Sequence, residues 1–158
     1  GKLVVNLNNA VNALSGLPLK AELGQRHYRL VLAAAQREAL GLLRRSGQAV
    51  VSPLAAPLAF MPWVLRMPDA VFARLARQMV EIDPQARSSM LDDLTRGRPT
   101  EIDYINGEVV ELAKKLGVSA PVNAALVSLI HQATASGEKW SGPELRREID
   151  DRTAAKVR

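Results

Sequence analysis

Apolar residues recur at steps of three and four along most of this 158-residue chain, a spacing that places them on one face of an α-helix. The apolar face of residues 2–15 consists of Leu3, Leu7, Ala10 and Leu14. Further helices are expected at 27–45, 69–82, 84–95, 101–116, 121–136 and from 142 onward. Glycine and proline separate these segments, because neither residue suits a helix interior. The pattern predicts an all-α bundle of about seven or eight helices over residues 1–158.

Residues 83–95 carry a signal for a helix start. Asp83 suits the N-cap position, and Pro84 suits the first turn, where its missing N–H has no helical partner to lose. The helix is therefore expected to begin at Pro84 and to end near Thr95. Ser89 then lies near the middle of the helix, where a serine side chain is usually exposed.

A second helix start follows the sequence Gly97-Arg98-Pro99. Pro99 fixes its own φ and moves Arg98 out of the α region, so the preceding helix must end here. Thr100 is expected to cap the next helix, with Asp103 completing a capping box. Glu101 then falls in the first turn, where the helix dipole favours a carboxylate.

Polar residues form a second stripe on the helix predicted for residues 2–15. Lys2, Asn6 and Asn9 occupy positions i, i+4 and i+7, within about 60° of arc. The four asparagines at positions 6, 8, 9 and 12 need a reason other than propensity, because asparagine is a poor interior helix residue. One explanation is a solvated polar face. The other is an amide-lined pocket wall with one ammonium, which suits a 2-oxo acid.

Composition narrows the class of protein. The chain is 47% hydrophobic, enough for a sizeable core. The absence of cysteine excludes disulfides and thiolate chemistry and is compatible with a reducing cytoplasm, the location we expect. No apolar run approaches the roughly 20 residues that span a membrane. A net charge of +5 is compatible with a nucleic-acid partner. The lysine and arginine residues are scattered along the chain, however, so a solvated surface or the binding of small anions explains the charge better. We expect no membrane or nucleic-acid partner and no metal site. His27 and His131 are expected at the surface.

Three runs of residues point to a family. They are GKLVVN at 1–6, SSMLDD at 88–93 and GRPTEIDYING at 97–107. In this order and at this spacing they resemble the C-terminal domain of the 2-dehydropantoate 2-reductases, or ketopantoate reductases. The resemblance implies a helical domain similar to those of 6-phosphogluconate dehydrogenase-like reductases.

The resemblance also implies roles for individual residues. By similarity, Lys2 is the general acid that protonates the carbonyl oxygen of the substrate. Asn6, Asn9 and Ser89 are implied to bind the substrate. Glu101 is implied to be a catalytic carboxylate on the cofactor side of the site.

The implied reaction is the NADPH-dependent reduction of 2-dehydropantoate to pantoate, a step towards pantothenate and coenzyme A. Family members bind NADPH mainly through an N-terminal nucleotide-binding domain. Its glycine-rich fingerprint is absent from residues 1–158, so this chain alone is expected to be inactive. The expected partners are a 2-oxo acid, that N-terminal domain and, in a homodimer, a second copy.

Two positions depart from the family pattern. Further substrate-binding asparagines of the family fall on Ala10 and near Lys20. A pocket that recognises a hydroxyl group discriminates through such amides, so a related 2-oxo acid is an alternative substrate. The second reading is a helical dimerisation or binding domain of such a related reductase.

Overall fold

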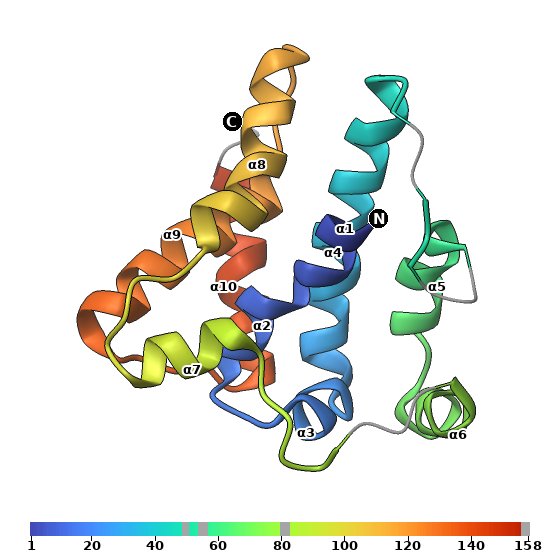
Figure 1. Cartoon of the computed structure of the whole chain (residues 1–158), viewed down its shortest axis with the longest axis vertical. Helices are drawn as coiled ribbons and strands as arrows, with labels where there is room; N and C mark the ends of the chain where they lie inside the picture. The colour runs from blue at the N-terminus through green and yellow to red at the C-terminus, as the bar shows by residue number, and fades with distance from the viewer. Residues whose placement is uncertain (49–50, 54–56, 80–82, 156–158) are drawn as a thin grey trace.

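A computed structural model describes residues 1–48, 51–53, 57–79 and 83–155, and every regular element in these ranges is helical (Figure 1). The elements are α1 (Lys2–Asn6), α2 (Asn8–Ser15), α3 (Leu19–Leu23), α4 (Arg26–Arg45), η1 (Leu58–Phe60), α5 (Met61–Leu65), α6 (Asp69–Met79), α7 (Ser89–Thr95), α8 (Ile102–Lys115), α9 (Pro121–Ser136) and α10 (Gly142–Ala155). The predicted all-α class is therefore confirmed. Within the described ranges, no helix combines the length and apolar character needed to cross a membrane.

The helices surround α2, which contacts α4, α7 and α9. In Figure 1, α8, α9 and α10 lie on one side of α1 and α2, while α4 lies on the other side, followed by α5 and α6. The buried face of α2 consists of Ala10, Val11, Ala13 and Leu14, all fully inaccessible to solvent. The small alanines allow neighbouring helices to approach closely, so α2 is the central element of the core.

The C-terminal end of α2 is held by residues from the far end of the chain. Lys139 Nζ donates to the carbonyl oxygen of Ala13 (3.2 Å), and the N–H of Trp140 donates to that of Leu14 (3.0 Å). The Tyr28 hydroxyl donates to the Trp140 carbonyl (2.8 Å), which connects this joint to α4. The last carbonyls of a helix lack partners within it, so these bonds satisfy them and fix the position of α2.

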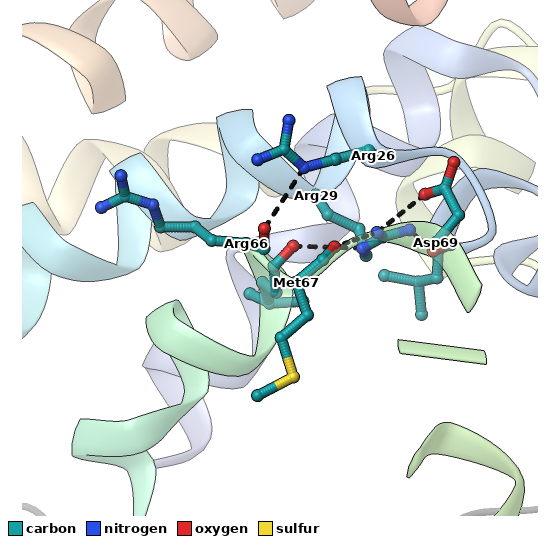
Figure 2. A network of polar contacts seen from close by, with 7 residues as sticks. Arg26, Arg29, Arg66, Met67 and Asp69 are labelled. Carbon is teal, nitrogen blue, oxygen red and sulfur yellow. Dashed lines mark hydrogen bonds and ion pairs between the residues drawn. The ribbon is translucent and has the colours of Figure 1, made fainter. Parts of the chain in front are cut away.

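Arg29 connects four helices from a fully buried position on α4. Its guanidinium donates to the carbonyl oxygens of Leu23 (2.8 Å), Leu65 (3.1 Å) and Met67 (2.8 Å). It also pairs with Asp69 (2.8 Å), and Figure 2 shows it between α4 and the residues that follow α5. Each carbonyl lies at or just beyond a helix end, where it has no helical partner. Arg29 therefore holds α3, α5 and α6 against α4.

The structure corrects the number of helices, because it has ten α-helices and one 3₁₀-helix in the described ranges instead of seven or eight. The helix expected over residues 2–15 is divided at Leu7 into α1 and α2, although Leu7 keeps helical dihedrals (φ −57°, ψ −21°). The short helices α3 and α5 have too few residues to show a periodic pattern. Residues 80–82, the predicted end of the 69–82 helix, lie outside the described residues.

Two predicted helix starts are also wrong. Asp83 and Pro84 form a turn, in which the N–H of Gln85 donates to Asp83 Oδ1 (2.8 Å), and the helix begins only at Ser89. Thr100 does not cap α8, because Glu101 occupies the N-cap position and no side chain bonds to the first turn. Asp103 Oδ1 instead accepts a hydrogen bond from Nε2 of His131 on α9 (3.1 Å).

Candidate functional site

Lys2 lies at the first position of α1, and its side chain is exposed. The residue before it, Gly1, packs closely against residues 51–53. A side chain at position 1 would collide with the carbonyl oxygen of Val51 and come within 2.9 Å of the ring of Pro53. This close approach fixes where α1 begins. Lys2 is therefore presented to solvent from an anchored helix end.

The four asparagines of α1 and α2 divide into two pairs with different surroundings. Asn8 and Asn12 are engaged in the fold: Asn8 Nδ2 donates to Glu22 (3.1 Å), and Asn12 Nδ2 donates to the carbonyl of Leu17 (2.9 Å). The side chains of Asn6 and Asn9 are half-buried and make no side-chain hydrogen bond among the described residues. The solvated-face explanation is thus wrong for Asn8 and Asn12, while Asn6 and Asn9 remain available to a ligand.

Glu22 is a fully buried acid beside this asparagine pair. Burial raises the pKa of its carboxyl group to about 8, against the opposing effects of the bond from Asn8 and the charge of Arg29. Glu22 Oε1 and Asn8 Oδ1 are both buried acceptors without a partner, so a proton on Glu22 supplies the donor that this cluster lacks. The bond from Asn8 to Glu22 therefore holds α3 against α2.

Ser88 and Ser89 have separate roles at the start of α7. Ser88 is buried at the N-cap position, and its hydroxyl accepts from the N–H of Leu91 (3.1 Å). Its N–H donates to Asn12 Oδ1 (3.0 Å), and its hydroxyl lies 3.4 Å from the Asn9 carbonyl oxygen. Ser89 is the first residue of α7, not a mid-helix residue as expected, and it is exposed. The bonds of Ser88 thus bring Ser89 next to the Asn9 region of α2.

Glu101 lies exposed at the N-cap position of α8. Further along this helix, the fully buried Asn106 donates to Asn123 Oδ1 of α9 (3.1 Å). Asn123 Nδ2 in turn donates to Glu38 of α4 (2.8 Å), and the two Glu38 oxygens accept the N–H groups of Val122 (2.8 Å) and Asn123 (3.0 Å). This chain of polar contacts fixes α8 and α9 against α4, and thereby the place of Glu101.

A surface cavity of about 620 Å³ lies beside α7 and is lined by Pro18, Gln85, Arg87 and Asp92. The N–H of Leu19 donates to the Ala86 carbonyl oxygen (2.8 Å) and joins the two segments that flank the cavity. The lining is mainly polar, so the cavity suits a charged or hydroxylated small molecule better than an apolar one.

The predicted site residues are brought together only in part. Hydrogen bonds connect the Ser89 region with the Asn9 region through Ser88. Among the described residues, no hydrogen bond or ion pair joins the side chains of Lys2 or Glu101 to these groups. The side chains of Lys2 and Glu101 are both exposed, so both are accessible to a ligand.

Sequence reasoning did not identify the buried polar residues that support the site. The fully buried members of this set are Asn12, Glu22, Arg29, Asn106 and Asn123. Their partners are distant in sequence; the bond between Asn12 and Ser88, for example, spans 76 positions. The one usable signal was the excess of asparagine in residues 6–12.

The described residues contain no group of three or more histidine, cysteine or carboxylate side chains that could hold a metal ion. They also contain no strand, and therefore no parallel sheet whose edge could bind a dinucleotide. The described residues therefore lack the sheet edge on which doubly wound domains hold such a cofactor.

Comparison with known proteins gives a consistent result. A family model described as "Ketopantoate reductase PanE/ApbA C terminal" matches residues 1–134. The 2-dehydropantoate 2-reductase of Archaeoglobus fulgidus is 41% identical over 54 residues, which are 34% of this chain and 18% of that protein. The enzyme of the same name from Pyrobaculum aerophilum is 37% identical over 94 residues, which are 54% of this chain and 34% of that protein.

Solved structures agree with this match. The ketopantoate reductase of Ralstonia eutropha superposes with a TM-score of 0.63 and 26% identity, covering 85% of this chain and 40% of that one. A ketopantoate reductase from Staphylococcus aureus gives a TM-score of 0.61 at 16% identity, covering 85% and 42%, and supports the fold alone. This chain therefore spans less than half the length of either structure.

Proposed function

We infer the function from one premise: the chain belongs to the ketopantoate reductase C-terminal family, whose model matches residues 1–134. We propose that residues 1–158 are the substrate-binding and catalytic domain of a 2-dehydropantoate 2-reductase. The reaction is the reduction of 2-dehydropantoate to pantoate, on the route to pantothenate and coenzyme A. The observation that carries the proposal is the bonding of Ser88 to Asn9 and Asn12, because it holds the motif at 88–93 against α2, the helix that follows the motif at 1–6.

We propose that Lys2 is the general acid of this reaction. During reduction, negative charge grows on the carbonyl oxygen of the substrate, and a positioned ammonium stabilises that charge and donates a proton. The exposed position of Lys2 at an anchored helix end supports this role. Asn6, Asn9 and Ser89 would hold the hydroxyl and carboxylate groups, since their side chains have no competing hydrogen-bond partners among the described residues.

The proposal requires a nucleotide-binding domain in addition to this helical one. NADPH, when bound by that domain, supplies the hydride. Glu101 would face the cofactor side of the site from its exposed position at the start of α8. The intact protein would then be cytoplasmic, and the active site would lie between the two domains.

The test is the reduction of 2-dehydropantoate by the full-length protein, followed as NADPH oxidation. We expect activity from the full-length protein and none from the 158-residue chain above a heat-killed control. A full-length protein that binds NADPH yet leaves 2-dehydropantoate unreduced would contradict the proposed substrate. Activity of the isolated chain would contradict the need for a second domain.

An alternative is a helical dimerisation domain of a related 2-oxo acid reductase. The observation that favours it is an exposed apolar surface on η1, α5 and α6, where Phe60 is 62% exposed, Trp63 75% and Val71 50%. Large aromatic side chains of this kind are enriched in the cores of protein interfaces. Sedimentation equilibrium of the full-length protein and of its Trp63→Ala variant measures this role separately from activity.

A further inference from the structure

We propose that Arg87 binds the carboxylate of the 2-oxo acid, in the cavity lined by Pro18, Gln85, Arg87 and Asp92, and thereby favours acids over their uncharged analogues. This inference rests on the proposed function and adds a residue to it. Arg87 is not part of any residue set that the sequence pattern or the family resemblance pointed to.

The need for another donor follows from the amides that this chain lacks. Ala10 replaces one expected asparagine and is fully buried, so no ligand can reach it. Lys20 stands near the other expected position. Asn8 and Asn12 are engaged with Glu22, Leu17 and Ser88. Asn6, Asn9 and Ser89 are therefore the neutral donors that remain for both the hydroxyl and the carboxylate, and none of them carries a positive charge.

The backbone on both sides of Arg87 is fixed. The Ala86 carbonyl oxygen accepts from the N–H of Leu19 (2.8 Å), and the N–H of Ser88 donates to Asn12 Oδ1 (3.0 Å). Arg87 lies between these two anchored residues, so its side chain projects from a defined position. A binding group on an anchored segment loses less conformational entropy when a ligand binds.

The charge of Arg87 is unpaired. No ion pair or hydrogen bond of its guanidinium occurs among the described residues, although Asp92 lines the same cavity. A guanidinium presents a planar fork that matches a carboxylate with two parallel hydrogen bonds. Asp92 in the same cavity disfavours a second negative group on the ligand and can accept a hydrogen bond from a hydroxyl. One carboxylate plus one hydroxyl is the chemistry that both residues accommodate.

The cavity also has a suitable position and size. Arg87 precedes Ser89 by two residues, and Asp92 follows Ser89 by about one helical turn, so the proposed substrate contact lies between them in α7. A volume of about 620 Å³ falls within the usual range for small-molecule sites, roughly 300–1,000 Å³. Arg87 and Asp92 thus flank Ser89 in the sequence, and the bonds of Ser88 to Asn12 and Asn9 hold this segment against α2.

The experiment is steady-state kinetics of the full-length Arg87→Gln variant with 2-dehydropantoate and NADPH. Loss of a charged hydrogen-bond pair predicts a KM for 2-dehydropantoate raised about 10-fold to 100-fold. The turnover number should change by less than about threefold, because Lys2 still donates the proton, and the KM for NADPH should not change. Arg37→Gln, which removes an exposed charge from α4, is the matched control and should leave all three constants unchanged.

A second readout separates binding from a structural role. Wild-type protein should be inhibited by pantoate more strongly than by the uncharged amide of pantoate, and Arg87→Gln should lose this preference. Arg87→Lys keeps the charge without the fork and should fall between the two. Arg87→Gln with a wild-type KM and an unchanged preference would overturn the inference while the proposed function stands. Wild-type protein inactive on 2-dehydropantoate would overturn both.

Discussion

The buried carboxyl group of Glu22 makes the stability of this domain depend on pH. In the unfolded chain its pKa is 4.5, and burial raises it to about 8 in the folded protein. Below pH 4.5 both states carry the proton. Between pH 4.5 and about 8 only the unfolded chain releases it, so the free energy of unfolding falls as the pH rises through this window.

The size of the effect follows from the shift in pKa. Each pKa unit corresponds to about 1.36 kcal/mol, so a rise from 4.5 to about 8 corresponds to at most about 5 kcal/mol. Small domains have total stabilities of about 5–15 kcal/mol. By about pH 8, where this fall is complete, a large part of the stability of the fold would therefore be lost.

The assay is urea unfolding of the 158-residue chain and its Glu22→Gln variant between pH 5 and 9.5. Glutamine keeps the shape and cannot ionise, so the variant should lack the fall between pH 5 and 8 and should be the more stable protein at pH 9. Glu108→Gln, an exposed substitution on α8, is the charge-matched control and should follow the wild-type profile. Parallel profiles for wild type and Glu22→Gln would refute the reasoning.

Two further substitutions test the contacts that position the site. Arg29→Met should lower the free energy of unfolding by about 3 kcal/mol or more, because it leaves three carbonyl oxygens without a donor. The control, Arg26→Met, removes one exposed bond to Arg66 and should lower it by less than about 1 kcal/mol. Equal effects in urea unfolding would contradict this difference. Glu38→Ala should lower it by about 1–2 kcal/mol, because it removes the acceptors for the first N–H groups of α9. The exposed Glu111→Ala should stay within about 0.5 kcal/mol of wild type, and a larger loss there than at position 38 would count against the capping role.

The long helices were predictable because burial on one face imposes a periodic pattern. The segment expected at 27–45 is α4, and the segment expected at 121–136 is α9, where Pro121 and Gly137 (φ 72°) mark the two ends. The start at Pro84 was predicted wrongly, because Asp83 forms a local turn with Gln85 that competes with a helix cap.

The polar supports of the site were not predictable from local sequence. Asn8 and Asn12 lie outside the predicted stripe of Lys2, Asn6 and Asn9, and their bonds to Glu22, Leu17 and Ser88 had no local signal. The burial of Glu22 depends on the packing of α3 against α2 and α4, which no short pattern encodes. Long-range contacts of this kind appear only when the helices are assembled.

The most direct test of the central claim is the turnover number of the full-length Lys2→Ala variant with 2-dehydropantoate and NADPH. General acid catalysis typically contributes about 10²–10⁴-fold, so we predict a loss of that size. The KM for 2-dehydropantoate should change less, because Asn6 and Ser89 still hold the substrate, and NADPH affinity should not change. A turnover number within about threefold of wild type, less than 1 kcal/mol in barrier height, would contradict the assignment of Lys2 as the general acid.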